Sequence, residues 1–231
     1  MTIQEIYEKF GIPPNLSEHM LTVTKVCLFL KDHWIGPELD WEKVTKTALL
    51  HDLGNIIRFD FDKHLEFWGD EAKRIDYWKS IQKQTIEKYG EEEHAATEKM
   101  LQEVGIDQET ITTILNKTFG NSVKVSQSED WYSKILLYAD MRVMPFGVST
   151  LEERMEDIRN RIPKYSTRVD FGDLVNACKE IEKQIQENIN VPVSEITKVS
   201  VERKDEGLLN CDVLQGGEGK ACDFSSLQTG Q

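Results

Sequence analysis

The chain has 231 residues, of which 39% are hydrophobic and 30% charged, and its formal net charge is −13. This length suits one domain of ordinary size with a tail. The acidic balance argues against a surface for duplex nucleic acid or anionic membranes. The sequence contains neither the roughly 18 successive apolar residues of a transmembrane helix nor the features of a signal peptide, so we expect a cytoplasmic protein.

Hydrophobic spacing is helical along most of the chain, and alternating patterns typical of strands are few. The helices that this spacing predicts cover residues 2–10, 15–33, 40–53, 70–89, 91–104, 107–117, 129–142, 149–161 and 170–188. A capping box at Ser149–Glu152 begins one of them. After residue 190 periodicity fades and small polar residues increase. We therefore predict an all-α, single-domain helical bundle over residues 1–190, followed by an irregular or disordered tail over residues 191–231.

The pair His51-Asp52 is the most unusual feature of this pattern, because it directly follows the apolar run of residues 47–50. A buried imidazole or carboxylate is costly unless it is paired or bound to a metal ion. We expect the helix to end here with Gly54 as a left-handed cap. The negative end of the helix dipole would then favour a cation at this point.

Three further polar residues fall on apolar stripes of other predicted helices: His19, His94 and Asp140. Each of them alone is most simply a hydrogen-bonded core residue or a helix cap. Together, on separate helices, they would be an expensive way to build a core. Imidazole and carboxylate ligands suit a divalent ion such as Mn, Fe, Ni, Co or Zn. The set therefore predicts a metal site.

The order His19, His51-Asp52 and Asp140 resembles the H…HD…D motif of the HD superfamily of metal-dependent phosphohydrolases. Residues 49–54 are similar to the central helix of that superfamily, and the resemblance spans roughly residues 15–165. It implies a helical bundle in which His19, His51, Asp52 and Asp140 ligate one metal ion. It also implies hydrolysis of a phosphomonoester or phosphodiester in a nucleotide or related small molecule.

Two departures from related branches bear on this expectation. His94 resembles the third histidine of branches with two metal ions, such as bacterial diadenosine tetraphosphate hydrolases, where a further histidine precedes a Thr-x-Gly turn. Here that turn is preceded by Lys117, whose charge disfavours a second ion, so we expect one ion with His94 and Lys117 facing substrate phosphate. Asn55 stands where deoxynucleoside monophosphate hydrolases of this superfamily carry glutamate, and asparagine cannot act as a general base.

The expected chemistry assigns a role to each remaining candidate. Asp52 or Asp140 would orient a water molecule, and His94 would protonate the leaving oxygen. Asn55, Arg58, Lys63 and Arg142 are candidates for contacts with the substrate, since arginine suits bidentate binding of phosphate. For Arg58 and Lys63 a solvated surface charge is the simpler interpretation.

Three interpretations remain open from the sequence, one of which is a purely structural helical bundle that binds neither metal nor ligand. Of the other two, the first is a metal-dependent phosphohydrolase with a small phosphorylated substrate. The second is an HD-type module that binds or senses nucleotides with weak or no turnover, and Asn55 and Lys117 favour it because each replaces a more reactive residue type. The resemblance also allows a homodimer, although the sequence has no heptad repeat that requires one.

Overall fold

The computed structural model describes residues 1–202 and 207–213, and the predicted tail at residues 203–206 and 214–231 lies outside the described residues. The described part is helical, which confirms the all-α prediction. Its α-helices are α1 (Ile3–Phe10), α2 (Pro14–His33), α3 (Trp41–Leu50), α4 (Ile75–Tyr89), α5 (Glu93–Glu103), α6 (Gln108–Asn116), α7 (Ser122–Ser126), α8 (Trp131–Met141), α9 (Leu151–Arg161), α10 (Pro163–Ser166), α11 (Phe171–Glu187) and α12 (Lys198–Glu202).

Short 3-10 helices and one hairpin complete the described part of the fold. The hairpin pairs β1 (Val143–Met144) with β2 (Gly147–Val148) in antiparallel register. The 3-10 helices are η1 (Asn55–Arg58), η2 (Leu65–Arg74), η3 (Phe119–Asn121), η4 (Val193–Glu195) and η5 (Leu208–Asn210). Among the described residues, no helix is long and apolar enough to cross a membrane.

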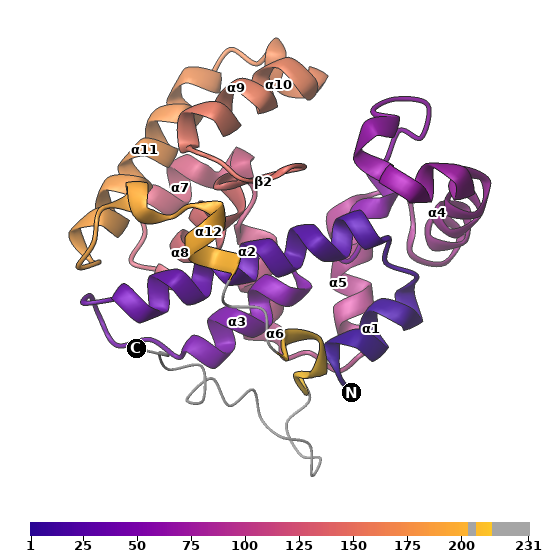
Figure 1. The fold of residues 1–231 in the computed structure, drawn as a ribbon, viewed down its shortest axis with the longest axis horizontal. Coiled ribbons are helices and arrows are strands. Elements are labelled where there is room, and N and C mark those ends of the chain that lie inside the picture. Colours follow the sequence, from indigo (N-terminus) through magenta and orange to yellow (C-terminus); the bar gives the residue numbers. More distant parts are fainter. Residues whose placement is uncertain (203–206, 214–231) are drawn as a thin grey trace.

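Helix α2 lies at the centre of the molecule (Figure 1), and every residue from Met20 to Leu30 is buried. A helix that is buried on all sides needs neighbours on all sides. Helices α3, α8 and α12 pack against it. Helices α2 and α8 and the turn after α3 carry the candidate metal ligands, so the site is built on the most buried elements of the fold.

Capping residues begin several helices close to where the sequence predicts. Asp40, Asp107 and Asp130 accept backbone amides at the starts of α3, α6 and α8. The capping box of α9 lies one residue later than predicted, because Thr150 rather than Ser149 accepts the amide of the glutamate three residues on, Glu153. Either hydroxyl suits this motif, so the sequence alone could not choose the register.

The predicted helix over residues 70–89 is shorter in the structure. Helix α4 begins at Ile75, and the chain before it forms η2 with a kink at Gly69, where φ is 50° and ψ is −128°. The kink lets Trp68 pack with Ile56 and Trp78 in a small hydrophobic cluster apart from the main core. Burial of this tryptophan therefore outweighs continuation of the helix.

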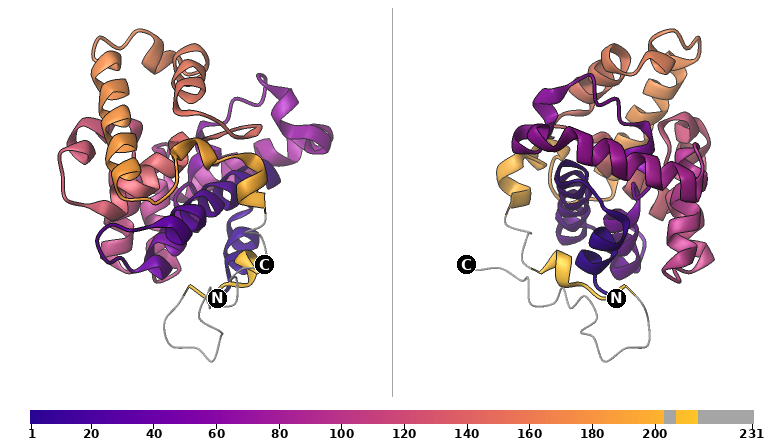
Figure 2. Two further views of the ribbon diagram at one scale, coloured as in Figure 1. Left: turned by 60° about the vertical axis from the view of Figure 1, so that its left-hand side comes forward. Right: turned by 90° about the vertical axis from the view of Figure 1, so that its right-hand side faces the viewer.

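The described residues after position 190 are packed, in contrast to the irregular tail that the sequence predicts. Helix α12 contacts α2, and Val201 and Leu208 are buried. The backbone of Thr2 pairs with that of Asp212 as an isolated bridge, and Figure 2 shows this part of the chain beside the N-terminus. The packing of this segment could not be predicted from its polar composition, because only single apolar residues within it reach the core.

Two groups of helices stand apart on either side of the hairpin (Figure 1). Helix α4 with η2 lies on one side, and α9 with α10 lies on the other. A cavity of about 580 Å³ is lined by residues of both groups and by the hairpin. The candidate site lies in this cavity.

Candidate metal centre

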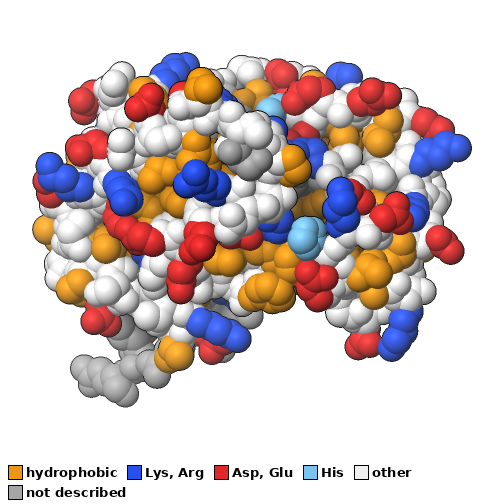
Figure 3. Space-filling model, turned by 90° about the horizontal axis from the view of Figure 1, so that it is seen from above, with side chains coloured by type: hydrophobic (Ala, Val, Ile, Leu, Met, Phe, Trp, Pro, Cys, Tyr) orange, Lys and Arg blue, Asp and Glu red, His pale blue; other side chains and the backbone are white. Residues whose placement is uncertain are grey.

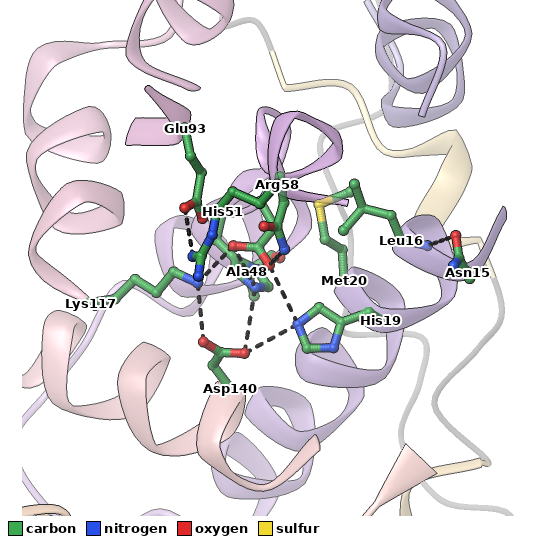
Figure 4. Close-up of polar contacts among 12 residues, drawn as sticks. Asn15, Leu16, His19, Met20, Ala48, His51, Arg58, Glu93, Lys117 and Asp140 are labelled. Atoms are coloured by element: carbon green, nitrogen blue, oxygen red, sulfur yellow. Dashed lines mark hydrogen bonds and ion pairs between the residues drawn. The ribbon is translucent and has the colours of Figure 1, made fainter. Parts of the chain in front are cut away.

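Three segments bring His19, His51 and Asp140 together (Figure 4). His19 comes from α2, Asp140 from α8, and His51 from the turn after α3. The Nε2 atom of His19 lies 3.1 Å from Oδ1 of Asp140, and Nε2 of His51 lies 3.9 Å from the same oxygen. One ligand atom from each residue lies within 4.8 Å of the others, so this group could hold a metal ion.

The ring of His51 is oriented as a metal ligand requires. Its Nδ1 lies 2.7 Å from the carbonyl oxygen of Ala48, and an N–H at Nδ1 leaves the lone pair on Nε2. The side chain is fully buried, and Nε2 has no hydrogen-bond partner among the described residues. Burial, aided by the charge of Lys117, lowers the pKa of His51 to about 4. The ring is therefore neutral near pH 7, the form that binds a metal ion.

Lys117 lies inside the centre and contacts both carboxylates. Its Nζ is 2.8 Å from Oδ1 of Asp52 and 3.1 Å from Oδ2 of Asp140. Although burial opposes its charge, Asp140 and Asp52 raise the pKa of Lys117 above its usual range. The same ammonium holds the pKa values of both aspartates below their usual range against the effect of burial. The two carboxylates and one ammonium leave a net negative charge, which suits a divalent cation.

Asp52 lies beside this group. Its Oδ2 accepts a hydrogen bond from Nδ2 of Asn55 at 3.0 Å, and its Oδ1 accepts one from Lys117. The closest distances from its carboxylate to the rings are 3.6 Å to Nε2 of His51 and 3.7 Å to Nε2 of His19. Its assignment as a metal ligand stays a prediction, and Asn55 acts on it as a positioning partner.

Gly54 is not the left-handed cap that the sequence predicts, since its φ is −84° and its ψ is 0°. The position requires glycine for another reason, which is close approach of α5. A Cβ atom here would lie 2.7 Å from the carbonyl oxygen of Glu93 and 2.7 Å from Oγ1 of Thr97. The amide of Gly54 also donates to that Oγ1 at 3.1 Å. This contact sets α5, which carries His94, directly against the His51-Asp52 turn.

The cavity opens onto the metal centre and brings most of the predicted site residues together. The predicted residues that line it are His19, Asp52, Asn55, Arg58, Lys63, His94, Lys117 and Asp140. His51 lies behind this surface, fully buried. Seen from above, Figure 3 shows basic and histidine side chains beside apolar ones around the hollow in the middle of this face. A charged small molecule with an apolar part would match this lining.

The cavity also carries residues that the sequence did not single out. Arg154, Arg161, Lys164 and Tyr165 line it from α9 and α10. Arginines and a lysine on polar helices are ordinary surface residues by pattern, and more than 100 residues separate them from His51-Asp52. Only the tertiary fold places them beside the metal centre, so the sequence carried no signal for them.

Arg142 does not reach the cavity, so the structure does not support its predicted contact with the substrate. Its side chain is buried, and its guanidinium donates to the carbonyl oxygens of Ser149, Val193 and Ile196. These bonds connect the hairpin to the segment before α12. The proximity of Arg142 to Asp140 in the sequence is misleading, because α8 ends between them and the side chain turns toward the C-terminal segment.

Arg58 and Lys63 line the cavity but differ in how they are held. Arg58 forms an ion pair with Glu93 at 2.6 Å across to α5, as Figure 4 shows. Lys63 pairs with Asp60 in its own loop at 2.8 Å, and 69% of its side chain is exposed. The side chain of Arg58 is therefore held in a more defined position for contact with a ligand than that of Lys63.

Comparison with known proteins gave no match to any family model, curated protein or solved structure. The assignment of a function therefore rests on the geometry of the metal centre and its cavity.

Proposed function

We propose that the chain is a metal-dependent phosphohydrolase of the HD type that acts on a nucleotide or related small phosphoester. The observation that carries the proposal is the group of His19, His51 and Asp140 at one end of a cavity of about 580 Å³. The cavity is large enough for a small organic phosphate. Its basic residues provide positive charge for the phosphoryl oxygens.

The donor set fits a single divalent ion. His19, His51 and Asp140 would hold it, and Asp52 is the candidate for a fourth ligand. Two imidazoles with carboxylates suit Mn, Fe, Ni, Co or Zn. When bound, such an ion supplies a Lewis acid and lowers the pKa of a coordinated water molecule. Lys117 occupies the space between the two aspartates, which favours one ion over two.

Side chains around the proposed metal site would orient the water molecule, neutralise the phosphoryl charge and protonate the leaving group. Because Lys117 keeps the pKa of Asp52 low, this carboxylate would accept a hydrogen bond from the attacking water and orient it, rather than store a proton. Arg58 would neutralise phosphoryl charge from the opposite side. His94 lines the cavity on α5 and is assigned the role of protonating the leaving oxygen.

Metal analysis of the protein purified without added metal tests this proposal. We expect near-stoichiometric divalent metal in the wild type and at least about tenfold less in His51→Ala, because a ligand whose Nε2 has no hydrogen-bond partner among the described residues is lost. His33→Ala is the matched control, since His33 contacts Asn190 and lies outside the cavity. A panel of phosphomonoesters and phosphodiesters with added Mn²⁺ would show turnover in the wild type and the control alone. Equal metal loading in His51→Ala would contradict the proposal.

A binding or regulatory module is the second candidate, and the position of Lys117 favours it. An ammonium that already contacts both aspartates reduces the need for a metal ion. Tight binding of nucleotides without hydrolysis across the panel would support the module. Hydrolysis of any panel member that depends on His51 would exclude it.

A further inference from the structure

The wall of the cavity formed by α9 and α10 carries more positive than negative charge. Arg154 and Arg161 share one carboxylate, Asp157, at 2.9 Å and 2.8 Å. Lys164, the third basic residue of this wall, has no ion-pair partner among the described residues. We call Arg154, Arg161 and Lys164 the cationic wall. In a chain with a formal net charge of −13, such a local excess of positive charge is distinctive.

Lys164 lies close to a second cation from another part of the fold. Partial desolvation, together with the positive charge of Arg58, lowers the pKa of Lys164. Lys164 is an exposed residue on the short helix α10, and its side chain lines the same cavity as Arg58. Two like charges held near one another are unfavourable in the absence of an anion. Their arrangement therefore favours binding of an anionic group.

The nearby carboxylates are already engaged. Glu93 accepts the ion pair from Arg58, and the oxygens of Glu92 accept the amides of His94 and Ala95 as the cap of α5. Neither carboxylate lies within ion-pair distance of Lys164. The charge of Lys164 is thus available to a ligand in the cavity.

Tyr165 connects this region to the metal centre. It lines the cavity, and its hydroxyl has no hydrogen-bond partner among the described residues. Burial raises the pKa of this hydroxyl, whereas the positive charges of Arg58, Arg168 and Lys117 oppose that rise. The Nζ atom of Lys164 lies over the ring of Tyr165, 5.1 Å from its centroid, so Tyr165 contacts the cationic wall. Lys117 and Lys164 line the same cavity, so a ligand that fills it can contact both regions.

Part of the remaining lining is apolar. Phe67 and Trp68 come from η2, and Ile158 and Ile162 come from the side of α9. These side chains provide a surface for an organic group and contribute no charge. An inorganic ion alone would leave this part of the cavity unused.

We propose that the cationic wall is a second anion subsite, so that the substrate class is an organic phosphate with at least two phosphoryl groups, such as a nucleoside diphosphate. The inference rests on the proposed function, because it places one phosphoryl group at the metal centre. The other phosphoryl group contacts Lys164, with Arg58 facing it. Lys164 is then a residue that determines specificity for diphosphates over monophosphates.

Calorimetric titration of the full chain as purified, with AMP and ADP as ligands, tests the subsite. We expect the wild type to bind ADP about tenfold more tightly than AMP, the gain of one charge-assisted contact. Lys164→Gln should remove most of this preference and leave the affinity for AMP within about twofold. Lys179→Gln is the matched control, because Lys179 is an exposed lysine of α11 outside the cavity and the change in net charge is the same. Arg161→Gln, expected to weaken ADP selectively as well, is a second variant at the wall.

Two results would overturn the inference: equal affinities of the wild type for AMP and ADP, or equal weakening of both ligands by Lys164→Gln. Analysis of each sample for hydrolysis products separates this inference from the proposed function. A preference for ADP that depends on Lys164, without hydrolysis of any phosphoester, would remove the hydrolase and retain the subsite. Hydrolysis that depends on His51, without a preference for ADP, would retain the hydrolase and remove the subsite.

Discussion

Lys117 is the residue on which the charge balance of the candidate metal centre depends. Its side chain is buried and contacts both aspartates. A buried carboxylate that loses its counter-charge is strongly unfavourable, and a metal ion is the natural replacement for the lost ammonium. If the centre binds a metal ion as proposed, the free energy of unfolding and the affinity for metal are linked through this side chain.

Lys117→Met should destabilise the metal-free protein by about 3–5 kcal/mol, because two buried carboxylates lose their ion pair. Divalent metal should then stabilise this variant more than it stabilises the wild type. Thermal unfolding with and without Mn²⁺ measures both effects. Lys134→Met is the matched control. Lys134 is a buried lysine like Lys117, but it belongs to α8 and its ammonium lies over the ring of Trp131. An unchanged response to metal in Lys117→Met would contradict this account of the centre.

At the scale of residues, the sequence was sufficient to locate the candidate ligands but not their contacts. His19 and Asp140 were detectable because polar residues on apolar helical stripes are rare and costly. The position of Lys117 was expected near the site, yet its contact with both aspartates depends on the side-chain conformation. Lys164 gave no signal at all, because a lysine on a polar helix is ordinary until the fold places it in a cavity.

At the scale of elements, the contact between the His51-Asp52 turn and α5 fixes the architecture of the site. Gly54 lies so close to α5 that there is no space for a side chain. The turn and the helix that bears His94 therefore keep a constant separation. Any residue larger than glycine must displace one of them.

Gly54→Ala should destabilise the protein by about 1–3 kcal/mol, because the added methyl group meets backbone atoms that cannot move aside. Chemical denaturation monitored by circular dichroism measures this loss. Gly172→Ala is the control on α11, where a Cβ atom would meet nothing within 4 Å. That substitution should be neutral or stabilising by up to about 1 kcal/mol, because alanine favours helices. Equal effects of the two substitutions would refute close packing at Gly54.

Element boundaries were predictable where a capping residue marked them. Thr2 and Gly11 delimit α1, and Asp107 begins α6 as expected. The boundaries were predicted wrongly where tertiary packing determines the end of an element. The kink at Gly69 depends on burial of Trp68, and the hairpin of β1 and β2 is too short to produce an alternating pattern.

At the scale of the whole molecule, the packed unit continues beyond residue 190. Arg142 binds the carbonyl oxygens of Val193 and Ile196, and α12 covers part of α2. The domain boundary was difficult to predict, because single apolar residues at positions such as 196 and 201 do not form a periodic pattern. Their burial is a property of the assembled fold.

Val201→Ala should lower the free energy of unfolding by about 2 kcal/mol, because it removes buried methyl groups and leaves a cavity. Val199→Ala, two residues earlier on α12, should have almost no effect, because 68% of Val199 is exposed. Urea denaturation of both variants measures the difference. If the two variants unfold at the same urea concentration, α12 does not belong to the cooperative unit.

The cationic wall belongs to a molecule whose net charge is strongly negative. This contrast affects the rate at which a phosphate ligand would bind. A phosphate in solution is repelled by the protein as a whole before it meets the basic residues of the cavity. Added salt screens the long-range repulsion over distances beyond about 10 Å. For the phosphate ligand proposed above, salt should accelerate the encounter and weaken the final contacts, so we expect faster association at moderate than at very low ionic strength.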